Sequence, residues 1–261
     1  MTASPPRSSP HRRLALGVLA ASVGAAAFVV CVPADAATAA CAAQSGPTVP
    51  TVVELYTSEG CSSCPPAERW LSALKGRDGV VALAFHVDYW DRLGWKDRFG
   101  SPAFTARQAA EQATNGARFS YTPQVVIDGR DRTDWSRARL ASTSRPPATI
   151  DVALAQRGDR FVATVTPGAG SPQRLAAYWA VTEQGHSTAV RAGENEGATL
   201  HHDFVVRDYE PVAAWTARSG AAETIAFVPS TRADAAHPRS VNLVVVDAAT
   251  GRPVQAVKVG C

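Results

Sequence analysis

The chain has 261 residues and an apolar content of 46%, enough for one large or two ordinary globular domains. Its formal net charge at pH 7 is only +3, which excludes binding to nucleic acid or acidic membranes through overall charge. The function therefore has to come from particular residues, which are taken below in chain order.

The N-terminus has the pattern of a secretory signal peptide. Arginines up to Arg12-Arg13 precede an uncharged run over residues 14–32, and the small residues around Ala36 suit cleavage. We predict a signal peptide over residues 1–36 and an exported protein, periplasmic or secreted. Its removal would lower the net charge from +3 to +1, because it takes away three arginines and one aspartate. Twin-arginine export and an uncleaved anchor are the alternatives.

Four cysteines follow the predicted signal peptide: Cys41, Cys61, Cys64 and Cys261. In an oxidising compartment an even number suggests two disulfides, for which three connectivities are possible. Cys41 and Cys261 lie at the two ends of the mature chain, so a structural disulfide that ties the termini together is the economical choice. The alternative is that both lie on frayed ends and pair with nothing.

The central motif is Cys61-Ser62-Ser63-Cys64, between an apolar, β-rich run over residues 52–56 and a helical pattern over residues 67–74. A helix N-terminus presents unpaired N–H groups to an anion and so favours a thiolate. We predict a redox-active cysteine pair, with a permanent disulfide or half of a zinc site as alternatives. Glu59 would oppose thiolate formation unless its side chain points away.

A second strand is predicted over residues 80–87, where the sequence is almost continuously apolar. Such a run is typical of a strand covered on both faces in a parallel sheet, and with the preceding helix it makes a βαβ unit. The end of this strand then reaches the same sheet edge as Cys61. His86 and Asp88 would lie there and tune the thiol, hold a metal, or only hydrogen-bond to backbone.

Residues 92–116 form a polar and aromatic insertion, within which a helix is predicted from Ser101-Pro102 to Asn115-Gly116. The insertion is expected to form a lid or substrate-facing wall, or else a satellite core. Thr122-Pro123 then heads a strand, where a proline is tolerated because no ladder bond is needed, and a hairpin turn follows it. A cis bond at Thr122-Pro123 would place that backbone against the cysteines.

This order of elements resembles the thioredoxin fold, in which a proline at the place of Pro123 is cis and faces the cysteine pair. More narrowly, motifs within residues 53–67, 84–97, 101–108 and 121–124 resemble the exported bacterial family catalogued as domain of unknown function 1223. The family implies a thioredoxin-like fold and no established reaction. Gly60 replaces the usual aromatic residue before the first cysteine, and Ser62-Ser63 replaces Gly-Pro.

Beyond residue 145 the sequence changes to short β-rich runs separated by turns, which predicts an antiparallel sandwich. The predicted fold class is therefore α/β: a thioredoxin-like domain with an insertion (residues 37–144), followed by an all-β sandwich-like domain (residues 145–261). The polar segment 193–197 is expected to pack on the first domain or hold a ligand. His201 and His202 point to opposite faces of a strand, so we expect surface or interdomain hydrogen bonds rather than a chelating pair.

Our leading hypothesis is an exported thiol–disulfide oxidoreductase that needs no cofactor and acts on protein thiols or disulfides. Cys61 attacks a substrate disulfide, Cys64 resolves the mixed disulfide, and Thr122 and Pro123 hold the substrate chain. One alternative is a copper or soft-metal delivery protein with Cys61, Cys64 and His86 as ligands. Another is a non-catalytic binding module with an inert disulfide. No nucleic-acid partner and no membrane contact beyond the signal segment are expected; the oligomeric state is open.

Overall fold

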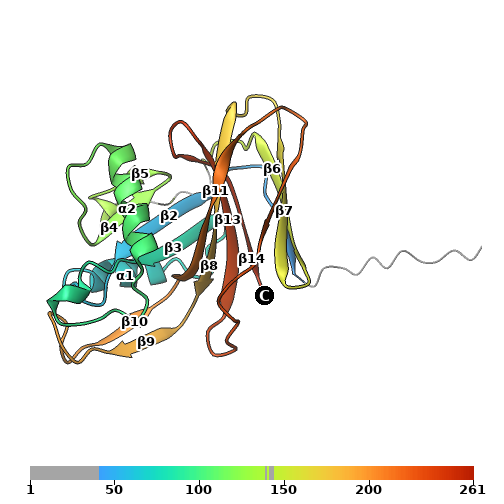
Figure 1. The fold of residues 1–261 in the computed structure, drawn as a ribbon. Helices are drawn as coiled ribbons and strands as arrows, with labels where there is room; N and C mark the ends of the chain where they lie inside the picture. Colours follow the sequence, from blue (N-terminus) through green and yellow to red (C-terminus); the bar gives the residue numbers. More distant parts are fainter. Residues whose placement is uncertain (1–40, 139, 141–143) are drawn as a thin grey trace, which may run out of the picture. The chain divides into compact units, whose positions relative to one another are not determined.

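The computed structural model describes residues 41–138, 140 and 144–261, so the predicted signal peptide lies outside the described residues. The described residues fall in one compact unit that extends to Cys261. They contain two α-helices and fourteen strands (Figure 1). Neither of these helices is long and apolar enough to cross a membrane.

Both α-helices occur in the first part of the chain. Its elements are β1 (Ala42–Gln44), β2 (Thr51–Thr57), α1 (Pro65–Ser72), β3 (Val80–His86), the 3-10 helix η1 (Asp91–Leu93), α2 (Pro102–Asn115), β4 (Gln124–Ile127), β5 (Arg130–Asp131) and the 3-10 helix η2 (Trp135–Arg137). The rest of the chain forms strands. These are β6 (Ile150–Arg157), β7 (Arg160–Pro167), β8 (Arg174–Glu183), β9 (His186–Ala189), β10 (Thr199–His202), β11 (Val205–Thr216), β12 (Glu223–Phe227), β13 (Arg239–Asp247) and β14 (Pro253–Gly260).

Strands from both parts of the chain form one eight-stranded mixed sheet, in the order β14-β13-β8-β11-β3-β2-β4-β5. Within it β2 and β3 run parallel, from Thr51 beside Val80 to Thr57 beside His86, and β4 is antiparallel to β2. The link between the two parts of the chain is β11, which is parallel to β3 and antiparallel to β8.

The predicted fold class is wrong. The structure is mostly β-sheet in several sheets, rather than an α/β thioredoxin-like domain followed by a separate sandwich. The physical reason is the backbone pairing at the free edge of β3, where Val205 of β11 lies beside Ala84 and the sheet continues across residue 145. A strand's own pattern of apolar residues does not reveal which distant strand will satisfy its backbone groups.

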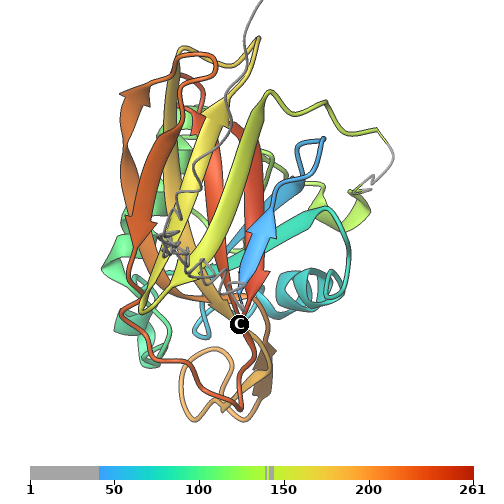
Figure 2. The ribbon, with the colours of Figure 1, turned by 90° about the vertical axis from the view of Figure 1, so that its right-hand side faces the viewer.

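A second, four-stranded sheet has the order β1-β6-β7-β12. Figure 2 looks onto this sheet, with β6 and β7 in yellow-green and yellow. Its inward side chains, such as Leu154 and Phe161, form one buried core with Trp179 of β8 and Leu243 of β13. The two sheets therefore pack face to face through alternating side chains, as in a β-sandwich.

The two helices cover opposite faces of β2 and β3. Because side chains alternate along a strand, Val53 and Leu55 pack with Leu71 of α1, whereas Tyr56 packs with Phe104 of α2. Both faces are thus buried, as the continuous apolar run of β3 predicts. The segments that follow β2 and β3 lead from this layer to the cysteines and the insertion.

The boundaries of α2 are confirmed as predicted. Ser101 is the N-cap, and its hydroxyl oxygen accepts a hydrogen bond from the amide of Ala103. Pro102 occupies the first helical position, where its missing N–H leaves no bond unmade. Gly116 ends the helix in the left-handed region, with φ of 68°, which a glycine adopts without steric cost.

Candidate functional site

The two central cysteines lie between the end of β2 and the start of α1. Cys61 and Cys64 form a disulfide with Cα atoms 5.5 Å apart. A second disulfide joins Cys41 to Cys261, with Cα atoms 5.9 Å apart, so the pairs are those that the sequence favours. Cys64 is the N-cap of α1, and prolines follow at its first two positions. The disulfide is therefore held directly ahead of a helix N-terminus.

The segment that precedes β4 lies against this disulfide. The peptide bond between Thr122 and Pro123 is cis. Ser63 Oγ lies 3.3 Å from Cys61 Sγ and donates a hydrogen bond of 3.4 Å to the Thr122 carbonyl. Trp90 Nε1 donates to Thr122 Oγ1 over 2.8 Å. A hydroxyl group thus connects the Cys61 sulfur to the Thr122 backbone, and the predicted residues Thr122 and Pro123 lie beside the cysteines.

Gly60 allows an aromatic side chain to pack against the cysteine segment. A Cβ atom added at residue 60 would come within 3.1 Å of Trp90 Cβ, closer than ordinary van der Waals contact. Trp90, which follows β3, therefore occupies the space beside residue 60, where a glycine stands in place of the usual aromatic residue.

Neither sulfur is open to solvent in the disulfide form, since Cys61 and Cys64 are both 0% exposed. The two serines between them are exposed. Access for a large substrate therefore requires that neighbouring groups move, and the structure shows which groups hold the segment in place.

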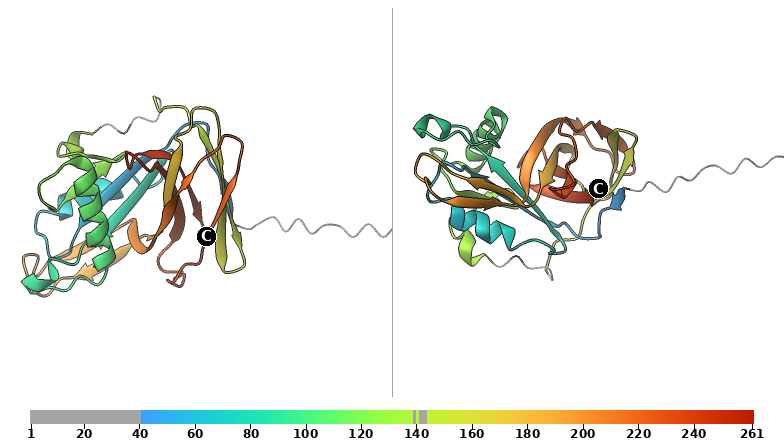
Figure 3. Two further views of the ribbon diagram at one scale, coloured as in Figure 1. Left: turned by 45° about the horizontal axis from the view of Figure 1, so that its top comes forward. Right: turned by 90° about the horizontal axis from the view of Figure 1, so that it is seen from below.

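The loop between β9 and β10, residues 190–198, bonds across the cysteine segment. Asn195 Nδ2 donates to the carbonyls of Glu59 (2.8 Å) and Cys61 (3.0 Å). The Glu194 carboxylate accepts from the amide and the hydroxyl of Ser62 at 3.1 and 2.8 Å. These bonds lower the pKa of Glu194, so a negative charge lies beside the cysteine pair. Figure 3 shows the β9–β10 hairpin beside α1.

Beneath the cysteines lies a group of five buried ionisable side chains, here called the carboxylate–histidine cluster. It comprises Glu59, Glu68, His86, Asp97 and His202, none of which is more than 5% exposed. They come from the β2–α1 loop, α1, β3, the insertion and β10. Sequence analysis identifies only His86 as a site candidate, because the other members lie in separate segments with no shared spacing.

Each histidine of the cluster is held by a carboxylate through its Nδ1 atom. His86 Nδ1 lies 2.7 Å from Asp97 Oδ2, and Asp97 also accepts the amide hydrogens of Glu59 and Phe99. His202 Nδ1 lies 2.5 Å from Glu68 Oε2. Thr57 donates its hydroxyl hydrogen to the other Glu68 oxygen.

The carboxylate of Glu59, two residues before Cys61, contacts Trp95 and His202. Trp95 Nε1 donates to Glu59 Oε2 over 2.8 Å, and Glu59 Oε1 lies 3.3 Å from His202 Nε2. Its charge is thus directed toward His202 and the insertion.

Burial and pairing pull the pKa values of this cluster in opposite directions. Burial lowers the pKa of His202, but hydrogen bonds and charges from Glu59 and Glu68 outweigh it and raise the pKa to about 10. Burial raises the pKa of Glu68, yet the bond and charge of His202 hold it below its usual value. The pKa of Asp97 is lowered in the same way, against burial, by His86.

The other predicted polar residues lie apart from the sulfurs. Asp88 accepts a hydrogen bond of 2.6 Å from the Thr105 hydroxyl at the start of α2. His86 lies with Glu68 and His202 and forms no hydrogen bond to either cysteine in the described part of the chain. His201 is exposed and His202 buried, as expected for neighbours on a strand.

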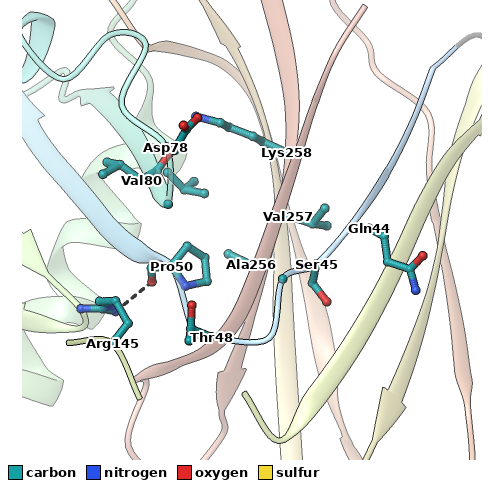
Figure 4. A pocket seen from close by; sticks show the side chains of 13 residues that line it. Gln44, Ser45, Thr48, Pro50, Asp78, Val80, Arg145, Ala256, Val257 and Lys258 are labelled. Atoms are coloured by element: carbon teal, nitrogen blue, oxygen red, sulfur yellow. Dashed lines mark hydrogen bonds between the residues drawn. The ribbon is translucent and has the colours of Figure 1, made fainter. Parts of the chain in front are cut away.

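A separate cavity of about 370 Å³ lies where β2 and β3 begin, at the ends of these strands away from the cysteines (Figure 4). Residues before β2, at the start of β3 and in β14 line it, among them Pro50, Asp78 and Lys258. The cysteines follow the carboxyl end of β2, whereas this cavity lies at the amino ends of the strands. It therefore forms no part of the cysteine site.

Comparison with known families matches residues 52–246 to "Protein of unknown function (DUF1223)". Among solved structures, protein AGR_C_4864 from Agrobacterium tumefaciens is 26% identical, with a TM-score of 0.62 over 81% of this chain and 94% of that chain. HBP35 of Porphyromonas gingivalis is 17% identical, with a TM-score of 0.55 over 82% and 76%, a likeness of fold alone. No curated protein matches the chain.

Proposed function

Because the chain belongs to the DUF1223 family of proteins of unknown function, we propose its function from its own site: thiol–disulfide exchange with other proteins through Cys61 and Cys64. The observation that carries the proposal is the position of their disulfide, ahead of α1 and beside the cis Thr122–Pro123 bond. Support for a thioredoxin-like affiliation is limited to this local arrangement.

The exchange has two steps, each a transfer between sulfurs. A substrate thiolate attacks Cys61 Sγ, the Cys61–Cys64 bond breaks, and Cys64 leaves with the electron pair. A second substrate thiolate then attacks the substrate sulfur of the mixed disulfide, and Cys61 leaves as a thiolate. The substrate thiols lose two electrons and two protons, and the cysteine pair gains them. In the reverse direction Cys61 attacks a substrate disulfide and Cys64 resolves it.

Two neighbouring groups favour a Cys61 thiolate and one opposes it. The positive end of the α1 dipole attracts an anion, without a free amide, because Pro65 and Pro66 carry no N–H and the next two amides donate to the Cys64 carbonyl. Ser63 Oγ, 3.3 Å from the sulfur, would donate its hydrogen to a thiolate by releasing the Thr122 carbonyl. The Glu194 carboxylate beside Ser62 acts against negative charge. Because these effects have opposite signs, a measured reduction potential of the Cys61–Cys64 pair has to decide whether the protein oxidises or reduces its partners.

Access to the sulfurs depends on the β9–β10 loop in this proposal. Both cysteines are buried, and Asn195 and Glu194 bond to the segment that carries them. Release of these bonds would expose Cys61 between the loop and Thr122. A partner would then lie along the Thr122–Pro123 backbone, next to the exposed serines.

The setting we propose is outside the cytoplasm. The predicted signal peptide and two disulfides in one chain are compatible with an oxidising compartment, where such bonds persist. Protein thiols or disulfides are the proposed partners. A small-molecule cofactor is not needed, because the electrons pass directly between sulfurs.

Exchange with a dithiol peptide tests the proposal. The oxidised wild-type chain should convert the peptide to its disulfide while Cys61 and Cys64 become reduced. Cys61→Ser should abolish the reaction. Reduced Cys64→Ser, mixed with the disulfide form of the peptide, should trap a mixed disulfide on Cys61 that mass spectrometry locates. Cys41→Ser with Cys261→Ser is the control and should retain exchange. Full activity in Cys61→Ser, or a potential below about −300 mV, would instead indicate an inert structural bond.

A further inference from the structure

Three buried atoms of the carboxylate–histidine cluster form no well-aligned hydrogen bond among the described residues: His86 Nε2, and the pair Glu59 Oε1 and His202 Nε2, which lie 3.3 Å from each other. Their residues are 0%, 0% and 1% exposed. Burying a polar atom without a partner is unfavourable, and most buried polar atoms in proteins are satisfied. A shared partner, either a proton or a metal ion, would satisfy these atoms, and His86 Nε2 has no other polar group to bond to among the described residues.

The other ring nitrogen of each histidine is already bound. Asp97 holds His86 Nδ1 at 2.7 Å, and Glu68 holds His202 Nδ1 at 2.5 Å. Metal-binding histidines have this same arrangement, in which a carboxylate fixes the ring and leaves Nε2 to the metal. Both rings of the cluster are thus oriented by partners of the kind that support a metal ligand.

The spacing within the cluster suits one metal ion. His202 Nε2 and Glu59 Oε1 are 3.3 Å apart, close to the ~3.3 Å that separates two ligands of a tetrahedral zinc ion with bonds of about 2.0–2.1 Å. The side chains whose donor atoms all lie within 4.8 Å of one another are Glu68, His86 and His202, so the two rings are close enough to share one ion. Phe99 packs on both rings, at 5.2 and 5.6 Å between centroids, and limits access of water.

The charges of the cluster also favour a cation. Glu59, Glu68 and Asp97 are acidic, and none of them pairs with a lysine or arginine among the described residues. With neutral histidines the cluster would carry three buried negative charges. A divalent ion offsets two of these, and burial of charge is tolerated in proteins when it is paired in this way.

We propose that His86 Nε2, His202 Nε2 and Glu59 Oε1 bind one divalent transition-metal ion of the zinc type, and that Asp97 and Glu68 hold the two rings. Nitrogen and oxygen donors of this kind suit Zn²⁺ and Co²⁺. The sulfurs take no part, because Cys61 and Cys64 form a disulfide. The site is therefore distinct from thiolate ligation by Cys61, Cys64 and His86. The competing occupant is a proton on His202, shared with the two glutamates.

Glu59, although fully buried, lies at the wall of a surface cavity of about 470 Å³, together with Trp95 and residues of β9. The same cavity carries Lys96, Arg98 and Arg191, which repel a free cation. We therefore expect the metal to be acquired mainly as the chain folds, and to exchange slowly afterwards.

Metal content of the full oxidised chain tests the proposal. Protein produced with zinc and purified without chelator should hold about one ion per chain by elemental mass spectrometry. The double variant Cys61→Ser, Cys64→Ser should keep it, and His201→Ala, the exposed neighbour, is the matched control. His202→Ala and His86→Ala should lose it. Because those variants remove buried side chains, Glu59→Gln provides a milder test, with affinity lowered by about tenfold or more.

Cobalt loading provides an independent readout on the wild-type chain. Co²⁺ bound during refolding should show ligand-field absorption without a sulfur-to-cobalt charge-transfer band. The proposal is overturned if wild-type protein holds no more metal than His202→Ala, both as purified and after refolding with Zn²⁺. It is also overturned if the double cysteine variant loses the ion. Neither result depends on whether Cys61 and Cys64 exchange disulfides.

Discussion

Two buried groups of charges lie on opposite faces of β2 and β3, and they balance their acids differently. On the α2 face, Glu54 accepts hydrogen bonds from Arg107 at 2.5 Å and Tyr56 at 2.8 Å, and a short one from Tyr178. On the α1 face, the acids of the carboxylate–histidine cluster bond to histidines and neutral groups. The α2 face therefore contains a cation that is built into the chain.

This difference matters because arginine and histidine behave differently as cations. Arg107 stays charged at any pH at which the protein folds, and its guanidinium lies 4.0 Å from the ring centre of Tyr178. The imidazoles of the cluster acquire charge only by taking a proton from solution. The α2 face is thus a fixed structural element, whereas the α1 face, beneath the cysteines, depends on what solution supplies.

The largest expected effect is the loss of the built-in cation. Arg107→Leu leaves the buried Glu54 carboxylate without its positive partner, so we expect the free energy of unfolding to fall by about 3–5 kcal/mol. Urea denaturation measures this. Adding Glu54→Leu should recover much of the loss, since the uncompensated charge is then absent. Arg160→Leu, at an exposed position of β7, is the control. If Arg107→Leu lowers the free energy of unfolding no more than Arg160→Leu does, Arg107 is not the cation that stabilises the α2 face.

Glu111 gives the α2 face its pH dependence. Burial, and next the charge of Glu54, raise the pKa of Glu111 to about 7, against the nearby Arg107. Between the ordinary value of 4.5 and about 7 the unfolded chain ionises this acid while the folded chain keeps it protonated, so stability falls as pH rises through that window. Below this pH window Glu111 is protonated in the folded and in the unfolded chain, so its ionisation costs the folded state no stability.

Glu111→Gln should remove this dependence. Relative to the wild type, the variant should gain about 3 kcal/mol of unfolding free energy as the pH rises from about 4 to about 8. Denaturant titrations at several pH values measure the difference, and Glu210→Gln, on an exposed part of β11, controls for a general loss of charge. A difference that is constant with pH would mean that Glu111 ionises normally in the folded protein.

The features that could be predicted from the sequence depend on residues close together in the chain. The helix α2 begins and ends where Ser101-Pro102 and Gly116 indicate, because caps act within one turn. The order of β2, the cysteines, α1 and β3 follows in the same way from local spacing. The cis bond at Thr122–Pro123 could be considered but not assigned, because the sequence allows both isomers.

What could not be predicted depends on contacts between distant segments. The pairing of Val205 with Ala84, which overturned the predicted fold class, involves backbone groups that every strand carries. The link from His202 to Glu68 joins β10 to α1, and no periodicity connects those positions. The polar segment 193–197 is expected to pack on the first domain or hold a ligand, and only the structure shows that Glu194 bonds to Ser62 in the cysteine segment.

The smallest expected effect links the α1 face to the disulfide above it. Asn195→Ala removes two hydrogen bonds, of 2.8 and 3.0 Å, that hold the cysteine segment under the β9–β10 loop. If opening of this loop limits access, a loss of about 1 kcal/mol should speed reduction of Cys61–Cys64 by dithiothreitol by roughly fivefold. Mass spectrometry of alkylated cysteines follows the rate. Glu196→Ala, exposed in the same loop, should leave it unchanged. Equal rates in the wild type and Asn195→Ala would show that a substrate reaches the sulfurs without displacing the loop, from the side of Thr122 instead.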